Sequence, residues 1–178
     1  MEQKVNVWKA NLTNGLILAL IGIVYSLVMY FLDLTLNKVQ GYVFLVVLLA
    51  MLYFLLKSYR DNFKHGMITY GESVGAGVIM SLYYVLIMAV FTYILYTVID
   101  PGLIGKQMAQ AEEAMRAKGN LTDEQIDAGM KLTEKFMKPG MMVVISIFFG
   151  MIWATIISLI ASIFVKKEGN PLIDTPSN

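Results

Sequence analysis

The sequence predicts an all-α fold: a four-span transmembrane helical protein with an extramembrane helical hairpin between spans three and four. Composition, four long apolar segments and one long polar interval predict this class. Hydrophobic residues make up 57% of the 178 residues and charged residues only 15%. A soluble domain carries about 25% charged residues. The deficit indicates a protein that lies in a bilayer.

Four segments are apolar for long enough to cross a membrane, which takes about 20 residues. We expect a single integral membrane domain, 1–178, with spans at about 12–32, 39–56, 73–99 and 141–165. The first contains no charged residue and is longer than the apolar core of a signal peptide, roughly 7–15 residues. We therefore expect it to be retained as a span. Residues 168–178 are predicted to form a flexible tail.

Lysine and arginine counts in the short loops predict the orientation, because cytoplasmic loops carry an excess of them. The short loop between the first two spans holds only Lys38. The opposite side holds seven basic residues: Lys4, Lys9, Lys57, Arg60, Lys64, Lys166 and Lys167. We predict that both termini are cytoplasmic and that the polar interval faces outward.

The polar interval, 100–139, contains two amphipathic helical patterns between proline breaks. The first has apolar positions at Ile104, Met108, Ala111 and Met115, and the second has a matching stripe at Ile126, Met130, Thr133 and Met137. Gly119 ends the first pattern, and Thr122 with Gln125 forms a capping box that begins the second. The interval therefore predicts a helical hairpin.

The stripes of this hairpin have two main interpretations. They pack against each other, or they bind a partner, since methionine-rich surfaces adapt to different partners. The mixed charge of the two helices disfavours a third arrangement, flat on lipid headgroups. The candidate partner-binding seam consists of Ile104, Met108, Met115, Ile126, Met130 and Met137.

Small residues recur four apart in spans three and four, a spacing that lets helices approach closely in lipid. They favour packing inside the four-span bundle, with homodimerisation as the alternative. The candidate helix-packing residues are Gly71, Gly75, Gly77, Ser81, Gly150, Ala154 and Ser158.

Three polar residues of span three are candidates for function. Glu72 is the acidic residue closest to the interior of a span, and an ionisable group there is a functional hypothesis. The alternative is an interfacial salt bridge or a first-turn charge. Tyr84 and Thr92 share a face with Ser81 and either line a substrate path or act as an interfacial anchor and a helix–helix contact.

Several classes of function are disfavoured by what the sequence contains. It has no cysteine and one histidine, which excludes disulfides, thiolate metal sites and multi-histidine cages. A net charge of +1 without a basic cluster gives no case for nucleic acid. No nucleophile, phosphate-binding or dinucleotide motif is present. We therefore predict no enzymatic activity, no cofactor and no metal.

Several short motifs resemble a bacterial membrane family catalogued as domain of unknown function 4199. They are Lys57-Ser58-Tyr59-Arg60-Asp61, the stretch from Gly66 to Gly71, Asp100-Pro101, the stretch from Leu121 to Ile126, and Phe136-Met137-Lys138-Pro139. The resemblance covers nearly the whole chain. It implies a small four-span integral membrane protein without assigned activity and brings no catalytic or binding residues with it.

These observations predict a non-enzymatic packing, assembly or partner-binding component of the bacterial inner (cytoplasmic) membrane. Its expected partners are the lipid bilayer and either a second copy or another membrane protein. The alternative is a small-solute permease or channel that acts as a homo-oligomer. That alternative requires a polar cavity lined by Ser81, Tyr84 and Thr92.

Overall fold

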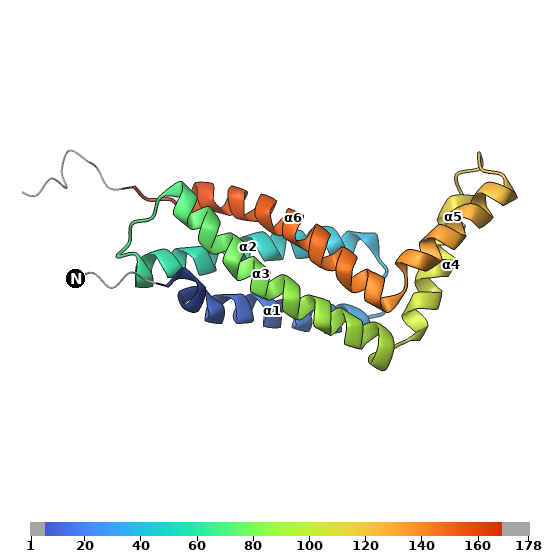
Figure 1. Cartoon of the computed structure of the whole chain (residues 1–178), viewed down its shortest axis with the longest axis horizontal. Coiled ribbons are helices and arrows are strands. Elements are labelled where there is room, and N and C mark those ends of the chain that lie inside the picture. The colour runs from blue at the N-terminus through green and yellow to red at the C-terminus, as the bar shows by residue number, and fades with distance from the viewer. Residues whose placement is uncertain (1–5, 169–178) are drawn as a thin grey trace, which may run out of the picture. The chain divides into compact units, whose positions relative to one another are not determined.

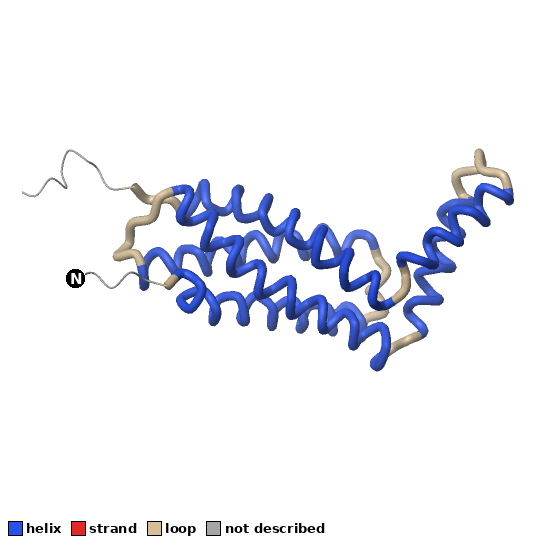
Figure 2. The backbone as a smooth tube through the Cα atoms, viewed as in Figure 1, coloured by secondary structure: helices blue, strands red, loops and turns tan. Residues whose placement is uncertain are grey.

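The computed structural model describes residues 6–168, and this part of the chain is helical. Figure 1 labels the elements, and Figure 2 shows helices joined by short loops. They are α1 (Val7–Phe31), α2 (Lys38–Phe63), α3 (Tyr70–Ile94), the π-helical turn η1 (Leu95–Ile99), α4 (Gly102–Arg116), α5 (Asp123–Phe136) and α6 (Pro139–Val165). No strand occurs within 6–168. The all-α prediction is confirmed, and the predicted tail lies outside the described residues apart from Glu168.

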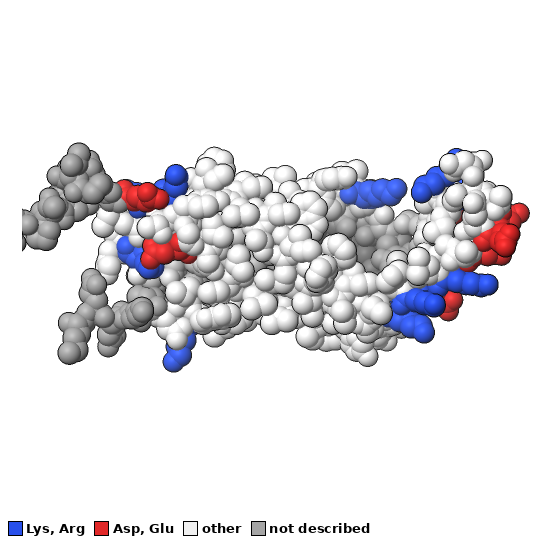
Figure 3. All heavy atoms as spheres, turned by 45° about the horizontal axis from the view of Figure 1, so that its top comes forward, with Lys and Arg blue, Asp and Glu red and all other residues white. Residues whose placement is uncertain are grey.

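Four of these helices are long and apolar enough to cross a membrane. They are α1, α2, α3 continued by η1, and α6, with 25, 26, 30 and 27 residues. At most 28% of the apolar window of each is buried inside the protein, so most of their apolar surface faces outward. Few charged side chains appear on the long helices in Figure 3. This is the surface of a multi-pass membrane protein, because lipid is the solvent that such a surface requires.

The helices extend beyond the predicted spans. The side-chain Oδ1 of Asn6 accepts hydrogen bonds from the backbone N of Trp8 and of Lys9, so α1 begins at Val7 rather than near residue 12. Similarly, α2 continues to Phe63 through charged residues that we expected to form a loop. Lysine and arginine are good helix formers. Hydropathy alone therefore does not mark where these helices end.

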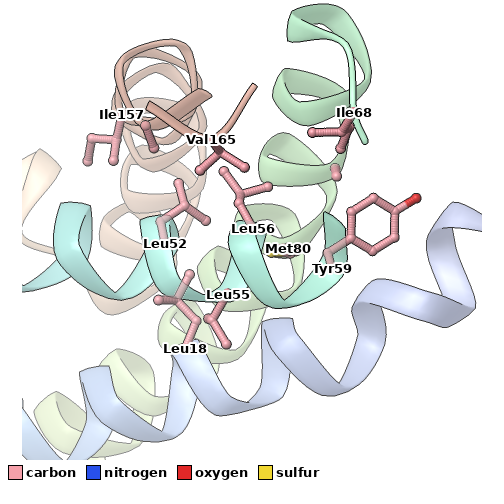
Figure 4. Close-up of a cluster of buried hydrophobic side chains, with 11 residues drawn as sticks. Leu18, Leu52, Leu55, Leu56, Tyr59, Ile68, Met80, Ile157 and Val165 are labelled. Carbon is pink, nitrogen blue, oxygen red and sulfur yellow. The ribbon is translucent and has the colours of Figure 1, made fainter. Parts of the chain in front are cut away.

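Contacts divide the chain into two compact units, residues up to Val85 with those from Met151 onward, and Leu86–Gly150. The first unit has the main apolar core, formed by α1, α2, the first part of α3 and the last part of α6 (Figure 4). Its members are Leu18, Leu52, Leu55, Leu56, Tyr59, Ile68, Ala76, Met80, Ile157, Ala161 and Val165. In Figure 4 the Tyr59 hydroxyl points away from this cluster.

The second unit is built around the pair α4–α5. The backbone N of Asp100 donates to Leu95 O at 2.8 Å, which closes the wide π turn, and Pro101 prevents the helix from continuing. Asp100 Oδ1 then accepts from the backbone N of Gly102, the first residue of α4. Gly119, with φ of +69°, ends the turn after α4. Both hydrogen bonds of the Thr122–Gln125 capping box are present, as predicted.

Candidate functional site

One polar region of the first unit lies where α2 ends, α3 begins and α6 ends. Arg60 Nη1 donates to the backbone O of Val165 at 3.0 Å, at the last residue of α6. The final carbonyls of a helix have no partner within it, so Arg60 caps α6. Beside it, Ile68 and Lys167 exchange two backbone hydrogen bonds of 2.9 and 3.0 Å. Arg60 and Ile68 both belong to the family-like motifs, and here they hold three helices together.

Glu72 has a structural role in the same region. Thr69 N donates to Glu72 Oε2 at 3.1 Å, and Glu72 N donates to Thr69 Oγ1 at 3.3 Å, which forms a capping box at the start of α3. Lys64 Nζ donates to Glu72 Oε1 at 2.6 Å, and this contact raises the pKa of Lys64. Of the two interpretations of Glu72, the geometry matches the salt bridge with a first-turn charge. The Thr-x-x-Glu spacing at 69–72 is the sequence signal for this capping box.

Two clefts flank the start of α1, and neither was predicted from the sequence. The smaller has a volume of about 450 Å³ and is lined by Asn6, Val7, Trp8, Tyr59, Lys64, Glu72, Gly75, Ala76 and Ile79. The larger, about 520 Å³, is lined by Asn6, Lys9, Ala10, Thr13, Asn14, Ser58, Asn62 and Phe63. The sequence signal for the larger cleft is the spacing of polar residues. They recur three and four residues apart in α1 and α2, at the ends of the two apolar runs.

The structure separates the candidate helix-packing residues into two groups. A Cβ atom at Gly77 would lie 2.8 Å from Ser158 Oγ, so α3 and α6 approach closely there. Ser81, Ala154 and Ser158 are buried, and Gly150 is half-buried. Gly71 and Gly75 are exposed instead, and a Cβ atom at either would meet nothing within 4 Å. The first group packs inside the protein, whereas these two glycines are exposed on α3 among residues 6–168, and Gly75 lines the smaller cleft.

The polar face proposed for span three is engaged in packing where it lies in the first unit. Ser81 is 3% exposed. Tyr84 packs against the core cluster, and its ring lies 6.5 Å from that of Phe44. Thr92 belongs to the second unit, where it is half-buried. A permeation path along this face would have to displace the packed side chains of Ser81 and Tyr84.

The candidate seam of the hairpin lies between α4 and α5, which pack together. Ile126 is 4% exposed, and a Cβ atom at Gly129 would lie 3.1 Å from Met115 Sδ. The other seam residues, Ile104, Met108, Met130 and Met137, are half-buried. This geometry matches a seam that packs on itself.

Two further residues of this unit were missed. Leu103 is 3% exposed. Gln107 Nε2 donates to Tyr96 Oη at 2.6 Å, which ties α4 to η1. Leu103 precedes the first position of the predicted stripe by one residue, so the buried face of α4 begins earlier than the stripe suggested.

No three His, Cys, Asp or Glu side chains come together as a metal site within residues 6–168. The fold and these sites define a multi-pass helical membrane protein. Residues 13–167 match the family described as a protein of unknown function, DUF4199, and the chain belongs to that family. No curated protein and no solved structure matches the chain.

Proposed function

We propose that this protein is a non-enzymatic component of the bacterial inner membrane that assembles with a second copy of itself through the exposed Gly71–Gly75 face of α3. The single observation that carries the proposal is that a Cβ atom at either glycine would meet nothing within 4 Å among the described residues, 6–168. In lipid, small residues four apart allow two helices to approach closely, and dispersion contacts between their backbones then stabilise the pair. Gly77, two residues further along, is already used against α6.

The surroundings of this face support an assembly role. Gly75 lines the cleft of about 450 Å³, beside Trp8 and Ile79. Trp8 is 51% exposed, so an arriving helix would bury a large aromatic side chain together with the glycine backbone. Gly75 thus connects the glycine pair to this cleft.

The proposal includes the predicted orientation, with both termini cytoplasmic and α4–α5 outside. Four lysines, Lys9, Lys57, Lys166 and Lys167, are exposed at the ends of α1, α2 and α6 that this orientation places in the cytoplasm. Lys4 lies outside the described residues. In the short flanking segments, seven basic residues on this side stand against Lys38 alone on the other, and the 100–139 interval carries a net charge of 6 − 7 = −1; both support the assignment.

The orientation predicts opposite accessibility for two introduced thiols, since the chain has no cysteine of its own. In intact spheroplasts, a membrane-impermeant maleimide is expected to label Asn120→Cys, between α4 and α5. It is expected to label His65→Cys, in the loop between α2 and α3, only after the membrane is permeabilised. The reverse pattern would show that α4–α5 is cytoplasmic.

The assembly interface predicts a site-specific disulfide. Gly75→Cys is expected to form a covalent dimer when native membranes are oxidised, because the two α3 helices would cross there. Ile160→Cys is a matched control: it lies on α6, a similar number of residues from a helix end, and is 41% exposed to lipid. We expect little dimer at position 160. Equal cross-linking at both positions would mean random collision and would contradict the interface.

A second variant separates assembly from folding. Gly71→Leu with Gly75→Leu has open space at both Cβ positions, so the fold is expected to be retained. The two leucine side chains would fill the surface of α3 that the α3 helix of a second copy would contact. Sedimentation in detergent is expected to show a monomer for the variant and a dimer for the natural chain. A monomeric natural chain would overturn the proposal.

A further inference from the structure

The outer face of α5 carries two large apolar side chains that its own unit does not cover. Leu132 is 55% exposed and Phe136 is 46% exposed. At 3.6 residues per turn they lie about 40° apart around the helix, whereas Ile126 of the seam lies about 120° from Leu132. The pair is therefore a second apolar face, separate from the seam. Lys131 and Lys135 lie next to Leu132 around the helix, on the side opposite to Phe136. Lys138 follows the end of α5. All three lysines are exposed.

The charges of the hairpin are sorted along its length. The half next to the long helices has Lys106, Lys131, Lys135 and Lys138 against Asp100 and Glu134, a net charge of 4 − 2 = +2. The half next to the turn has Arg116 and Lys118 against Glu112, Glu113, Asp123, Glu124 and Asp127, a net charge of 2 − 5 = −3. The two helices together have mixed charge, which disfavoured contact with lipid headgroups along their whole length. Their charges are nevertheless separated into a basic half and an acidic half.

We propose that the basic face at the end of α5, formed by Lys131, Leu132, Lys135, Phe136 and Lys138, binds anionic phospholipids of the bilayer in which the protein lies. Chain connectivity supports this partner. Phe136 precedes Pro139, the first residue of α6, by three residues, so the two lie within about 10 Å of each other. The face is therefore tethered beside a helix that enters the membrane.

The length of α6 is sufficient for its Pro139 end to lie at the headgroups. Its 27 residues span about 40 Å, whereas the hydrocarbon core is about 30 Å thick. The surplus of about 10 Å leaves room for that end among the headgroups. There Leu132 and Phe136 reach the acyl boundary, and the lysines extend their apolar stems toward the phosphates. The acidic half is repelled by the same surface, which favours contact through the end of α5 alone.

The absence of native cysteine allows a direct test on the full chain. A nitroxide spin label attached to the cysteine of Leu132→Cys reports where this face lies. The labelled side chain is itself largely apolar, so it keeps the apolar character of this position. Glu134→Cys is the matched control, two residues away and on the opposite side of α5, about 160° around the helix. The protein is reconstituted in nanodiscs of phosphatidylcholine alone, and in nanodiscs that also contain phosphatidylglycerol. Collision rates with oxygen and with a water-soluble nickel chelate are measured.

In the anionic nanodiscs, the label at 132 is expected to show a several-fold fall in collisions with the chelate and a rise in collisions with oxygen. The label at 134 is expected to stay accessible to the chelate. Lys131→Gln, Lys135→Gln and Lys138→Gln together are expected to return the label at 132 to water, with unchanged helix content by circular dichroism. A label at 132 that is equally wet in both lipids overturns the proposal. Equal burial in both lipids, or burial that survives the lysine changes, also overturns it.

Discussion

Replacing Gly15 by alanine is expected to destabilise the helix bundle by about 3 kcal/mol, the upper part of the range for inserting a methyl group into a packed core. A Cβ atom at Gly15 would lie 2.6 Å from Tyr83 Cβ and 2.9 Å from the backbone O of Met80. Both atoms are close to the α3 backbone, so neither moves without moving the helix. The free energy of unfolding can be measured by titration with SDS in mixed micelles.

Gly41→Ala is the control for this substitution. Position 41 of α2 has open space around the added Cβ atom, and alanine is the better helix former by about 1 kcal/mol in water. We expect no loss of stability for Gly41→Ala. If Gly15→Ala proved as stable as Gly41→Ala, the close approach of α1 and α3 would be wrong.

Replacing Ile126 by alanine is expected to open the α4–α5 hairpin. Ile126 is 4% exposed, and removing most of a buried isoleucine side chain costs about 3 kcal/mol. The two helices have 15 and 14 residues, near the length at which isolated helices are marginal in water, so their mutual packing stabilises them. We expect the amides of α4 and α5 to lose hydrogen-exchange protection while those of α2 keep theirs.

Leu132→Ala provides the comparison on the same helix. Its side chain is 55% exposed, so its removal is expected to leave protection of the hairpin nearly unchanged in detergent. The two variants together distinguish a seam that packs on itself from one that waits for a partner. Retained protection in Ile126→Ala would favour the partner, because the buried contact would then contribute little to the isolated chain.

Local sequence signals were sufficient for the presence of the long helices and for the start of one short helix. Apolar runs of the required length marked four long helices, and the Thr122–Gln125 spacing located the start of α5. These features depend on neighbours within a few residues. The same kind of signal at Thr69 and Glu72 was available, and it explains a carboxylate that otherwise suggested function. The ends of the helices were harder to predict from the sequence, because α2 continues beyond its apolar run to Phe63.

The tertiary structure decided which members of a repeated pattern are used. Gly71, Gly75 and Gly77 are all small residues of one helix, yet only Gly77 contacts α6, because the direction of each residue depends on where the neighbouring helix lies. The two clefts and the contact between Arg60 and Val165 bring together residues distant in sequence. By itself the sequence determined an all-α membrane protein with two short helices between its third and fourth long helices, since hydropathy and capping are local. The choice of packed and open faces required long-range contacts, which only the folded chain defines.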